Sequence, residues 1–319
     1  MSETDAPGFL EPIFFPYASA EQRTAAGGDA RFVHYTTAEA AKSIIQNRQV
    51  WMRNSTTMND YSEIRHGAEA LASAYNGATG ADFKANLEAL FPGICGRIEQ
   101  NYNGWHEHFK LNTYIACLSR HQPHEDKLGR LSMWRAYCAC SGVALIVKGD
   151  PFIARSDALK AYTTPVAYLD HAGFDREFAA IATAIKQNAE LLKNAGEEAV
   201  FANVVAMFRF AIIGTKHPGF AEELEWRVIT TPAYDKSERL VSEIETIRGV
   251  PQTVMKIPLQ NVPEEGLVGI EIPDFLDHVI IGPSPYPWAL WEAFVRLLKD
   301  AGIPNPESRV TVSQIPLRT

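Results

Sequence analysis

Two carboxylates and a guanidinium lie close together in the segment E-E-L-E-W-R at 222–227. If this segment is a β-strand, Glu223, Glu225 and Arg227 point to one face and the apolar residues between them point to the other. Carboxylates grouped in this way can stabilise a positive, oxocarbenium-like sugar or act as a general base. A solvated strand face with cross-strand ion pairs explains the same pattern, so the residues alone leave both interpretations open.

A second group, His34, Tyr35 and Thr36, stands where a short predicted strand (31–35) enters a helix. Residues at such loop-facing positions often contribute to binding sites. A neutral histidine ring can donate or accept a hydrogen bond, for example with a ribose hydroxyl. The other interpretation is a structural histidine, with Thr36 and Glu39 forming a capping box at the start of the helix.

Ser119 ends another predicted strand, and a short predicted helix at 131–138 follows. Trp134 and Tyr137 share one face of this helix because they are three residues apart. Two aromatic rings on one helix face are typical of a hydrophobic core, and they also suit a cleft that stacks against a planar ring.

Asn59 and Asp60 precede a predicted helix at 61–76. Asp60 can cap this helix, and Glu63 stands where a capping box has its acidic residue. Asn59 suits a left-handed turn position. The pattern alone therefore favours a helix cap over a binding site.

Several potential zinc ligands occur in one stretch of the chain, namely Cys117, His121, His124, Cys138 and Cys140. Sulfur and imidazole suit zinc, but these spacings match no standard zinc pattern, and we expect no metal site. The sequence also lacks the glycine-rich patterns of nucleotide-binding loops and the G-x-S-x-G elbow of hydrolases.

The elements that position these residues alternate irregularly along the chain. Hydrophobic periodicity predicts strands at 31–35, 49–53, 112–119, 142–148, 159–168, 223–230, 252–258, 266–271, 277–281 and 309–314. It predicts helices at 37–48, 61–76, 81–110 with a break at Pro92-Gly93, 131–138, 172–214 as two helices broken near 194–196, and 287–301. This order lacks a regular βαβα repeat, and it indicates an α+β fold with mixed or antiparallel central sheets and helical insertions.

The length of 319 residues suits two domains or one large domain. We expect residues 1–30 to form a partly flexible N-terminal tail, because this segment is acidic and interrupted by prolines. We expect residues 31–319 to form a single α+β domain, with the helical stretch at about 172–214 as an insertion.

The charge balance restricts the classes of partner. The chain has 30 Lys and Arg against 38 Asp and Glu, which gives a formal net charge of −8 and predicts no broad nucleic-acid-binding surface. There is no apolar run long enough to cross a bilayer, so we expect no membrane partner. The N-terminus lacks the pattern of a signal peptide, which indicates a cytoplasmic protein with reduced cysteines.

Several of these motifs, taken in order, resemble a widespread and mostly bacterial family known as domain of unknown function 2971. The motifs are F-V-H-Y-T-T at 32–37, W-M-R-N at 51–54, M-N-D-Y-S-E at 58–63, C-L-S at 117–119, M-W-R-A-Y at 133–137, G-V-A-L at 142–145 and E-L-E-W-R-V-I at 223–229. The resemblance runs from about 32 to 232, with a looser continuation to D-H-V-I-I-G at 277–282. The helical stretch at 172–214 and the N-terminal tail depart from the family pattern.

The opening strand and helix also look like those of ADP-ribosyltransferases, which implies a split-sheet core and NAD as the substrate. In that superfamily an early strand holds the NAD ribose, a middle strand contributes a Ser or Tyr, and a late strand supplies the catalytic Glu. The resemblance implies that Glu225 is catalytic, preceded by Glu223 in a Glu-x-Glu pattern. It implies that the NAD-binding residues are His34, Tyr35, Thr36, Asn59, Ser119, Trp134, Tyr137 and Arg227.

Particular roles follow from this resemblance. His34 would hold the adenosine-side ribose, and Asn59 would bind the nicotinamide amide or a phosphate. Tyr137 or Trp134 would form the wall that stacks on nicotinamide. Arg227 would pair with Glu223 or contact the pyrophosphate. Fold-level analogy implies these roles without establishing them.

The function indicated is an NAD-dependent ADP-ribosyltransferase or another NAD-cleaving enzyme, with a role in phage defence or a toxin-like role. The acceptor macromolecule is not identified by the sequence. One alternative is a non-catalytic module that senses a nucleotide, which would bind NAD without releasing nicotinamide. A second alternative is a nucleic-acid-processing enzyme, which would depend on Mg²⁺ or Mn²⁺.

Overall fold

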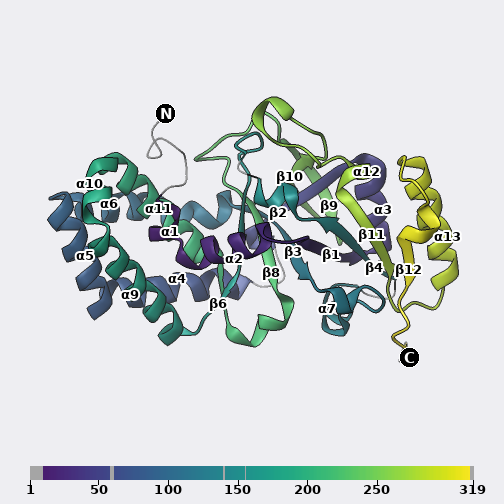
Figure 1. The fold of residues 1–319 in the computed structure, drawn as a ribbon, viewed down its shortest axis with the longest axis horizontal. Coiled ribbons are helices and arrows are strands. Elements are labelled where there is room, and N and C mark those ends of the chain that lie inside the picture. Colours follow the sequence, from purple (N-terminus) through teal and green to yellow (C-terminus); the bar gives the residue numbers. More distant parts are fainter. Residues whose placement is uncertain (1–9, 58–60, 139–140, 155, 317–319) are drawn as a thin grey trace. The chain divides into compact units, whose positions relative to one another are not determined.

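The computed structural model describes residues 10–57, 61–138, 141–154 and 156–316 (Figure 1). The chain divides into two compact units. Unit 1 consists of Met1–Thr24, Ser55–Asn112 and Thr164–Ala221, and unit 2 consists of Ala25–Asn54, Thr113–Thr163 and Glu222–Thr319.

Unit 2 is built on a 10-stranded sheet in which β11 and β12 are parallel and the other described pairings are antiparallel. The strand order is β12-β11-β4-β1-β3-β2-β10-β9, with β8 beside β3 and β5 beside β8. The strands are β1 (Arg31–Thr37), β2 (Gln49–Asn54), β3 (Tyr114–His121), β4 (Gly142–Lys148), β5 (Tyr162–Pro165), β8 (Glu225–Thr230), β9 (Val241–Ile247), β10 (Val250–Pro258), β11 (Leu276–Ile281) and β12 (Val310–Val312).

The helices of this unit are α3 (Ala38–Asn47), α7 (Leu131–Tyr137), α8 (Asp150–Ile153), α12 (Ile272–Phe275) and α13 (Pro287–Asp300). Short 3₁₀ turns are η4 (Pro123–Glu125), η6 (Pro263–Glu265) and η7 (Pro306–Arg309). The turn η5 (Pro218–Glu223) begins in unit 1, and its last two residues, Glu222 and Glu223, lead into β8 in unit 2. This combination confirms the α+β fold class expected from the sequence.

Strand β3 has three neighbours, and they divide the sheet. β8 pairs with β3 along Tyr114–Ser119, whereas β1 pairs with its end at Ser119–His121 and β2 with its start at Tyr114 and Ile115. A strand has two edges, so β1 and β2 share the edge opposite β8. They diverge from each other beside residues 116–118 of β3, where the sheet is split.

Strand β4 is buried on both faces, as its uninterrupted apolar sequence predicts. Alternate residues from Val143 to Val147 join a cluster that includes α3 and α13, while Ala144 and Ile146 join a second cluster with Met133 and Trp134 of α7. Side chains alternate across a strand, so these clusters lie on opposite faces of the sheet.

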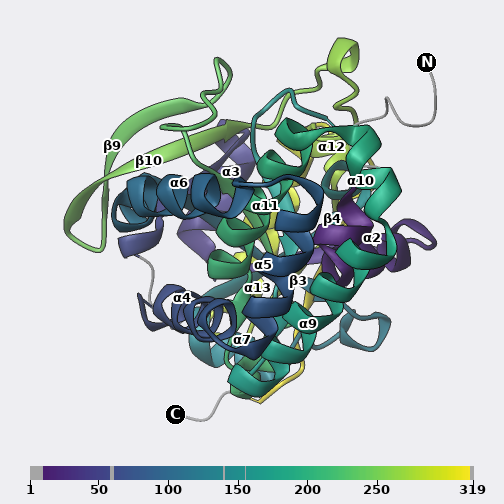
Figure 2. The same cartoon turned by 90° about the vertical axis from the view of Figure 1, so that its left-hand side faces the viewer.

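Unit 1 is mainly helical, and its helices can be followed in Figure 2. Its elements are α1 (Glu11–Phe14), most of α2 (Pro16–Ala26), η2 (Ser55–Thr57), α4 (Tyr61–Asn76), α5 (Ala78–Leu90), α6 (Ile94–Phe109), η3 (Lys110–Asn112), β6 (Ala167–Tyr168), α9 (His171–Gln187), α10 (Ala189–Ala195), α11 (Glu197–Ile213) and β7 (Thr215–Lys216). Its core contains an aromatic cluster, in which Phe83 of α5 meets Phe178 of α9 and Phe208 of α11.

Helices α4 and α11 approach so closely that only a glycine fits between them. A Cβ atom added at Gly67 would lie 2.3 Å from the carbonyl oxygen of Ile212. The sequence pattern located both helices, but it gave no sign of this contact.

The described part of the N-terminal segment is mainly helical. Helices α1 and α2 occupy most of its described part, and Phe15 meets Phe210 of α11 edge to face. The Tyr17 hydroxyl donates a hydrogen bond of 3.2 Å to the carbonyl of Val166.

Most of the predicted strands and helices are confirmed, and the differences have local causes. Thr37, not Thr36, caps α3, because β1 pairs with β4 as far as Thr37 and keeps Thr36 extended. The segment 159–168 forms two short strands of different sheets, and 172–214 forms three helices, α9 to α11.

Two further differences lie near the C-terminus. Residues 266–271 form no strand, and only the bridge between Val262 and Leu267 remains there. Strand β9 was not predicted, because most of its residues are exposed, Glu243 and Glu245 are charged, and no buried apolar residues recur along it.

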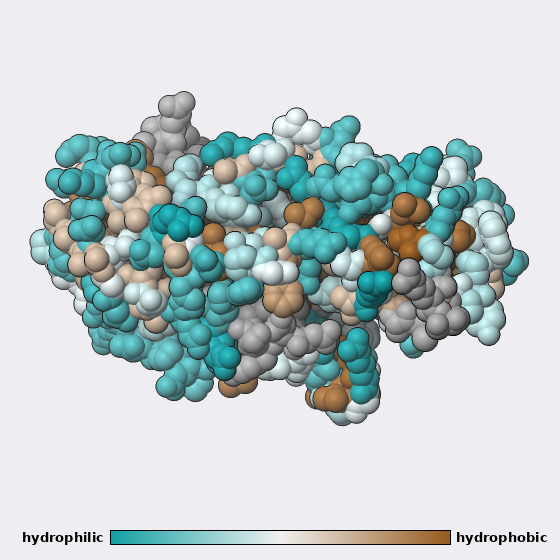
Figure 3. Space-filling view, turned by 90° about the horizontal axis from the view of Figure 1, so that it is seen from below, coloured by the Kyte–Doolittle hydropathy of each residue, from teal (hydrophilic) through white to brown (hydrophobic). Residues whose placement is uncertain are grey.

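No described helix combines the length and apolar character needed to cross a bilayer. The face seen in Figure 3 is mainly hydrophilic, with apolar side chains in small separate patches.

Candidate functional site

Strand β8 contains a buried ion pair. Arg227 Nε donates to Glu225 Oε1 at 2.8 Å, and Arg227 Nη2 donates to Oε2 at 3.2 Å. The two residues are 2% and 7% exposed, and they lie two positions apart on one face of the strand. A bidentate contact of this kind fixes the orientation of the carboxylate plane.

Glu223 does not share that strand face. It ends η5, and Leu224 after it has a φ of 46°, so β8 begins at Glu225. The predicted strand face of Glu223, Glu225 and Arg227 is therefore wrong for Glu223. The Tyr137 hydroxyl instead donates a hydrogen bond of 3.2 Å to Glu223 Oε1.

Ser119 of β3 lies directly opposite Glu225 of β8 and Val33 of β1. Cross-strand partners in an antiparallel sheet share a face. The hydroxyl of Ser119 and the carboxylate of Glu225 therefore belong to the same face, and both residues are buried.

His34 occupies the point where β1 leaves β3. Its Nδ1 atom lies 3.0 Å from the carbonyl oxygen of Cys117, which belongs to the β3 segment beside the split. A carbonyl is only an acceptor, so Nδ1 carries the proton and Nε2 is the acceptor of the neutral ring. Burial lowers the pKa of His34, although the hydrogen bond to Cys117 opposes this, and the neutral ring is favoured near pH 7.

Tyr35 and Trp134 are part of the core on the α7 face. Their rings meet edge to face with centroids 4.8 Å apart. A Cβ atom at Gly282 would lie 2.8 Å from the Trp134 ring, so this ring is closely enclosed. For Trp134, this packing agrees with the hydrophobic-core interpretation of the sequence.

The structure therefore brings some of the predicted residues together and separates others. Ser119, Glu225 and Arg227 share one face of the sheet where β3 pairs with β8. His34 follows Val33, the β1 partner of Ser119, so its side chain leaves the strand on the opposite face and reaches β3 only at the Cys117 carbonyl. Thr36 pairs with Val143 inside the sheet. Asn59 lies outside the described residues.

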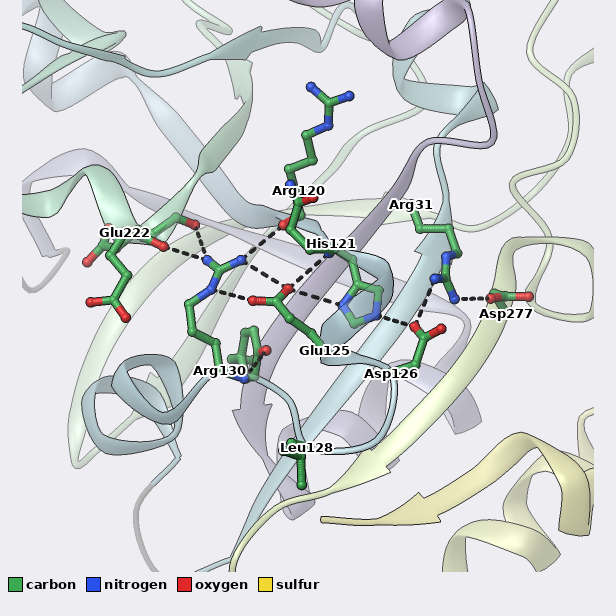
Figure 4. A network of polar contacts seen from close by, with 12 residues as sticks. Arg31, Arg120, His121, Glu125, Asp126, Leu128, Arg130, Glu222 and Asp277 are labelled. Atoms are coloured by element: carbon green, nitrogen blue, oxygen red, sulfur yellow. Dashed lines mark hydrogen bonds and ion pairs between the residues drawn. The ribbon is translucent and has the colours of Figure 1, made fainter. Parts of the chain in front are cut away.

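A second polar cluster, which the sequence did not predict as a site, surrounds Arg130 (Figure 4). Arg130 is 8% exposed, and its Nε donates to Glu125 Oε1 at 2.7 Å. Its Nη1 donates to the carbonyls of Glu222 at 2.6 Å and Glu223 at 3.0 Å. Its backbone N–H donates to the Tyr35 hydroxyl at 2.8 Å.

The cluster continues from Glu125 to the edge of the sheet. His121 Nε2 lies 2.7 Å from Asp126 Oδ1, and Arg31 donates to Asp126 and to Asp277. Burial acts to raise the pKa of Asp126, but the hydrogen bond from His121 and the charge of Arg31 outweigh it and hold this pKa below its usual value.

No strand or helix was predicted for residues 121–130, and only His121 and His124 among them were considered, as zinc ligands. One sequence signal pointed to local structure in this segment, because Gln122 and Glu125 have the spacing of a capping box, and they form such a box in η4. No periodic pattern links Glu125 to Arg130 or either residue to Glu222, because these contacts depend on the turns between strands.

No described group of three His, Cys, Asp or Glu residues is arranged to hold a metal ion. Of the considered zinc ligands, His121 contacts Asp126, and Cys140 is not among the described residues.

Three histidines of unit 2, one buried and two partly buried, predict how stability depends on pH. Burial is the largest cause that lowers the pKa of His34, His121 and His278. The unfolded chain takes up protons near pH 6.5, where the folded protein does not. The contribution of these groups to the free energy of unfolding is therefore complete above about pH 6.5 and is lost as the pH falls through the lowered values.

We expect the thermal midpoint to fall by several degrees between about pH 7 and pH 5, above the titration range of ordinary carboxylates. In the His278→Gln variant the thermal midpoint should fall less over the same pH range, because one of the three histidines with a lowered pKa is removed. A midpoint that stays constant or rises on acidification would contradict this account.

Comparison with known proteins gives a match to a protein family. Residues 133–228 match the model of a family of proteins of unknown function, DUF2971. The matched region runs from α7 into β8 and contains Tyr137, Glu223, Glu225 and Arg227. No curated protein and no solved structure matches the chain.

Proposed function

We propose that unit 2 binds NAD where β1 leaves β3 and cleaves the bond between its ribose and nicotinamide. The observation that carries this proposal is the contact between His34 Nδ1 and the Cys117 carbonyl, two residues along β3 from the facing pair Ser119 and Glu225. The contact joins the early strand to the middle strand, and the facing pair joins the middle strand to the late strand, which is the order of binding and catalytic strands in ADP-ribosyltransferases.

The split of the sheet supports the same proposal. β1 and β2 share one edge of β3 and diverge along it, as the resemblance to a split-sheet core implies. His34 stands at this divergence, and its neutral ring offers Nε2 as an acceptor for a ribose hydroxyl.

The chemistry requires little proton transfer. When the C–N bond between ribose and nicotinamide breaks, the electron pair goes to nicotinamide, which leaves as a neutral molecule. The ribosyl carbon becomes positive, and a carboxylate held beside it stabilises that charge. Glu225 supplies the carboxylate, and Arg227 fixes its orientation. A water or acceptor hydroxyl then adds to the carbon, and its proton passes to solvent water.

One observation also supports the sensing alternative. Arg227 contacts both oxygens of Glu225, and this arrangement suits a site that binds a nucleotide without cleaving it. The two functions are separated by measuring bound NAD and released nicotinamide in the same sample. Free ADP-ribose in that sample would identify water as the acceptor, and protein-bound ADP-ribose would identify a macromolecule.

Replacing His34 by Ala is expected to weaken NAD binding about tenfold, because one hydrogen bond to the ribose is lost. Isothermal titration calorimetry of the full chain measures this affinity. His278→Ala is the matched control, since His278 is another sheet histidine, on β11, with a 2.8 Å contact to Thr311. Equal NAD affinity in the wild type and His34→Ala would contradict a role for His34 in binding.

A further inference from the structure

The turn before β8 has an unfavourable backbone that other residues must stabilise. Leu224 has a φ of 46°, in the left-handed region that leucine rarely adopts. This turn sets the start of β8, and Glu223 and Glu225 lie on either side of Leu224. The position of both carboxylates therefore depends on what holds the turn.

Three consecutive carbonyl groups of the turn accept hydrogen bonds from two neighbouring segments. Arg130 Nη1 donates to the carbonyls of Glu222 and Glu223 at 2.6 and 3.0 Å. The backbone N–H of Arg120 donates to the carbonyl of Leu224 at 2.8 Å. Figure 4 shows the guanidinium of Arg130 directed at the turn.

Arg130 is itself held in place. Glu125 accepts from Arg130 Nε at 2.7 Å and from Nη2 at 3.1 Å, and Nη2 also donates to the carbonyl of Arg120 at 3.2 Å. The Glu125 carboxylate is fixed in turn by the backbone N–H of Gln122 at 3.0 Å. A planar fork with five donors satisfies all these acceptors at once, which a lysine ammonium cannot do.

We infer that Arg130 is a positioning residue that holds the turn at 222–224 and thereby sets where Glu223 and Glu225 lie; its effect on catalysis rests on the proposed NAD cleavage. Arg130 acts through the backbone of the turn, and its side chain belongs to a cluster formed by η4, α7 and the end of β3. A loosened turn would leave the His34 side of the binding site intact and would disturb the carboxylate side.

The test compares Arg130→Lys with the wild type in the full chain. Nicotinamide release should show kcat lowered at least about tenfold, because small displacements of a reacting group are costly. The KM for NAD should stay within about twofold, because ground-state binding is retained. The backbone amides at 222–225 should exchange with deuterium faster than in the wild type.

Arg309→Lys is the matched control. Arg309 Nη1 also donates to a backbone carbonyl and to a carboxylate, both of Asp277, at 2.8 and 3.2 Å. This variant should change neither kcat nor amide exchange at 222–225.

The outcomes separate the inference from the proposed function. Unchanged amide exchange at 222–225 in Arg130→Lys would overturn the inference, whatever the activity. Faster exchange without any nicotinamide release by the wild type would support Arg130 as the residue that holds the turn and would refute NAD cleavage. If the loss of kcat in Arg130→Lys equalled the loss of folded protein measured by thermal unfolding, Arg130 would have a structural role only and the inference would be overturned.

Discussion

Replacing Glu225 by Gln is expected to lower nicotinamide release from NAD by at least about 100-fold, the usual cost of removing a group that stabilises transition-state charge. The substitution keeps the size of the side chain and removes the negative charge that, in the proposed mechanism, stabilises the positive ribosyl carbon. Initial rates of nicotinamide release, measured by chromatography, test this expectation.

The variant needs a check of folding, because Arg227 is 2% exposed and loses its charged partner. Assays should therefore be run well below the thermal midpoint of the variant. Glu245→Gln is the matched control, since Glu245 is also ion-paired, with Lys256, but lies on β9 at the far end of the sheet order. Activity of Glu225→Gln equal to that of Glu245→Gln would refute the catalytic role.

Replacing Arg130 by Met is expected to cause the largest loss of stability. Arg130 and Glu125 are 8% and 4% exposed, so the substitution leaves a buried carboxylate without its counter-charge. Breaking a buried pair in this way costs about 3–5 kcal/mol. The thermal midpoint should therefore fall by roughly 10 °C, at the usual midpoint shift per kcal/mol of lost stability for a protein of this size.

The same substitution at an exposed arginine provides the comparison. Arg97 contacts both Glu197 and Glu198, but these residues lie at the surface of unit 1. Solvent screens such pairs, so Arg97→Met should leave the midpoint nearly unchanged. If calorimetry gave equal shifts for the two variants, the buried cluster around Arg130 would not stabilise the fold as described.

The sequence predicted those parts of the fold that depend on local periodicity. The apolar run of β4 and the short segment R-F-V-H-Y of β1 were sufficient to locate two central strands, and the helical spacing at 61–76 located α4. It missed β9, whose residues are exposed and gain their partners only from β10. It also could not show that β1 and β2 share one edge of β3, because strand order depends on contacts between distant segments.

The candidate site was predicted in part for the same reason. Glu225 and Arg227 stand two apart in a strand, and this spacing alone placed them on one face. Glu223 was assigned to that face as well, because the left-handed backbone at Leu224 left no signal in the sequence. Arg130 was not recognised, since the carbonyls that it binds belong to a turn 92 and 93 residues away.

The central claim is that this chain cleaves NAD, and the most direct measurement is the amount of nicotinamide that the wild type releases over time, with NAD binding measured on the same preparation. The account predicts that nicotinamide accumulates beyond one equivalent per chain and that NAD binds with measurable heat. Binding without release would instead support a nucleotide-sensing module. If the chain neither releases nicotinamide nor binds NAD, the assignment of an NAD site beside β1, β3 and β8 is contradicted.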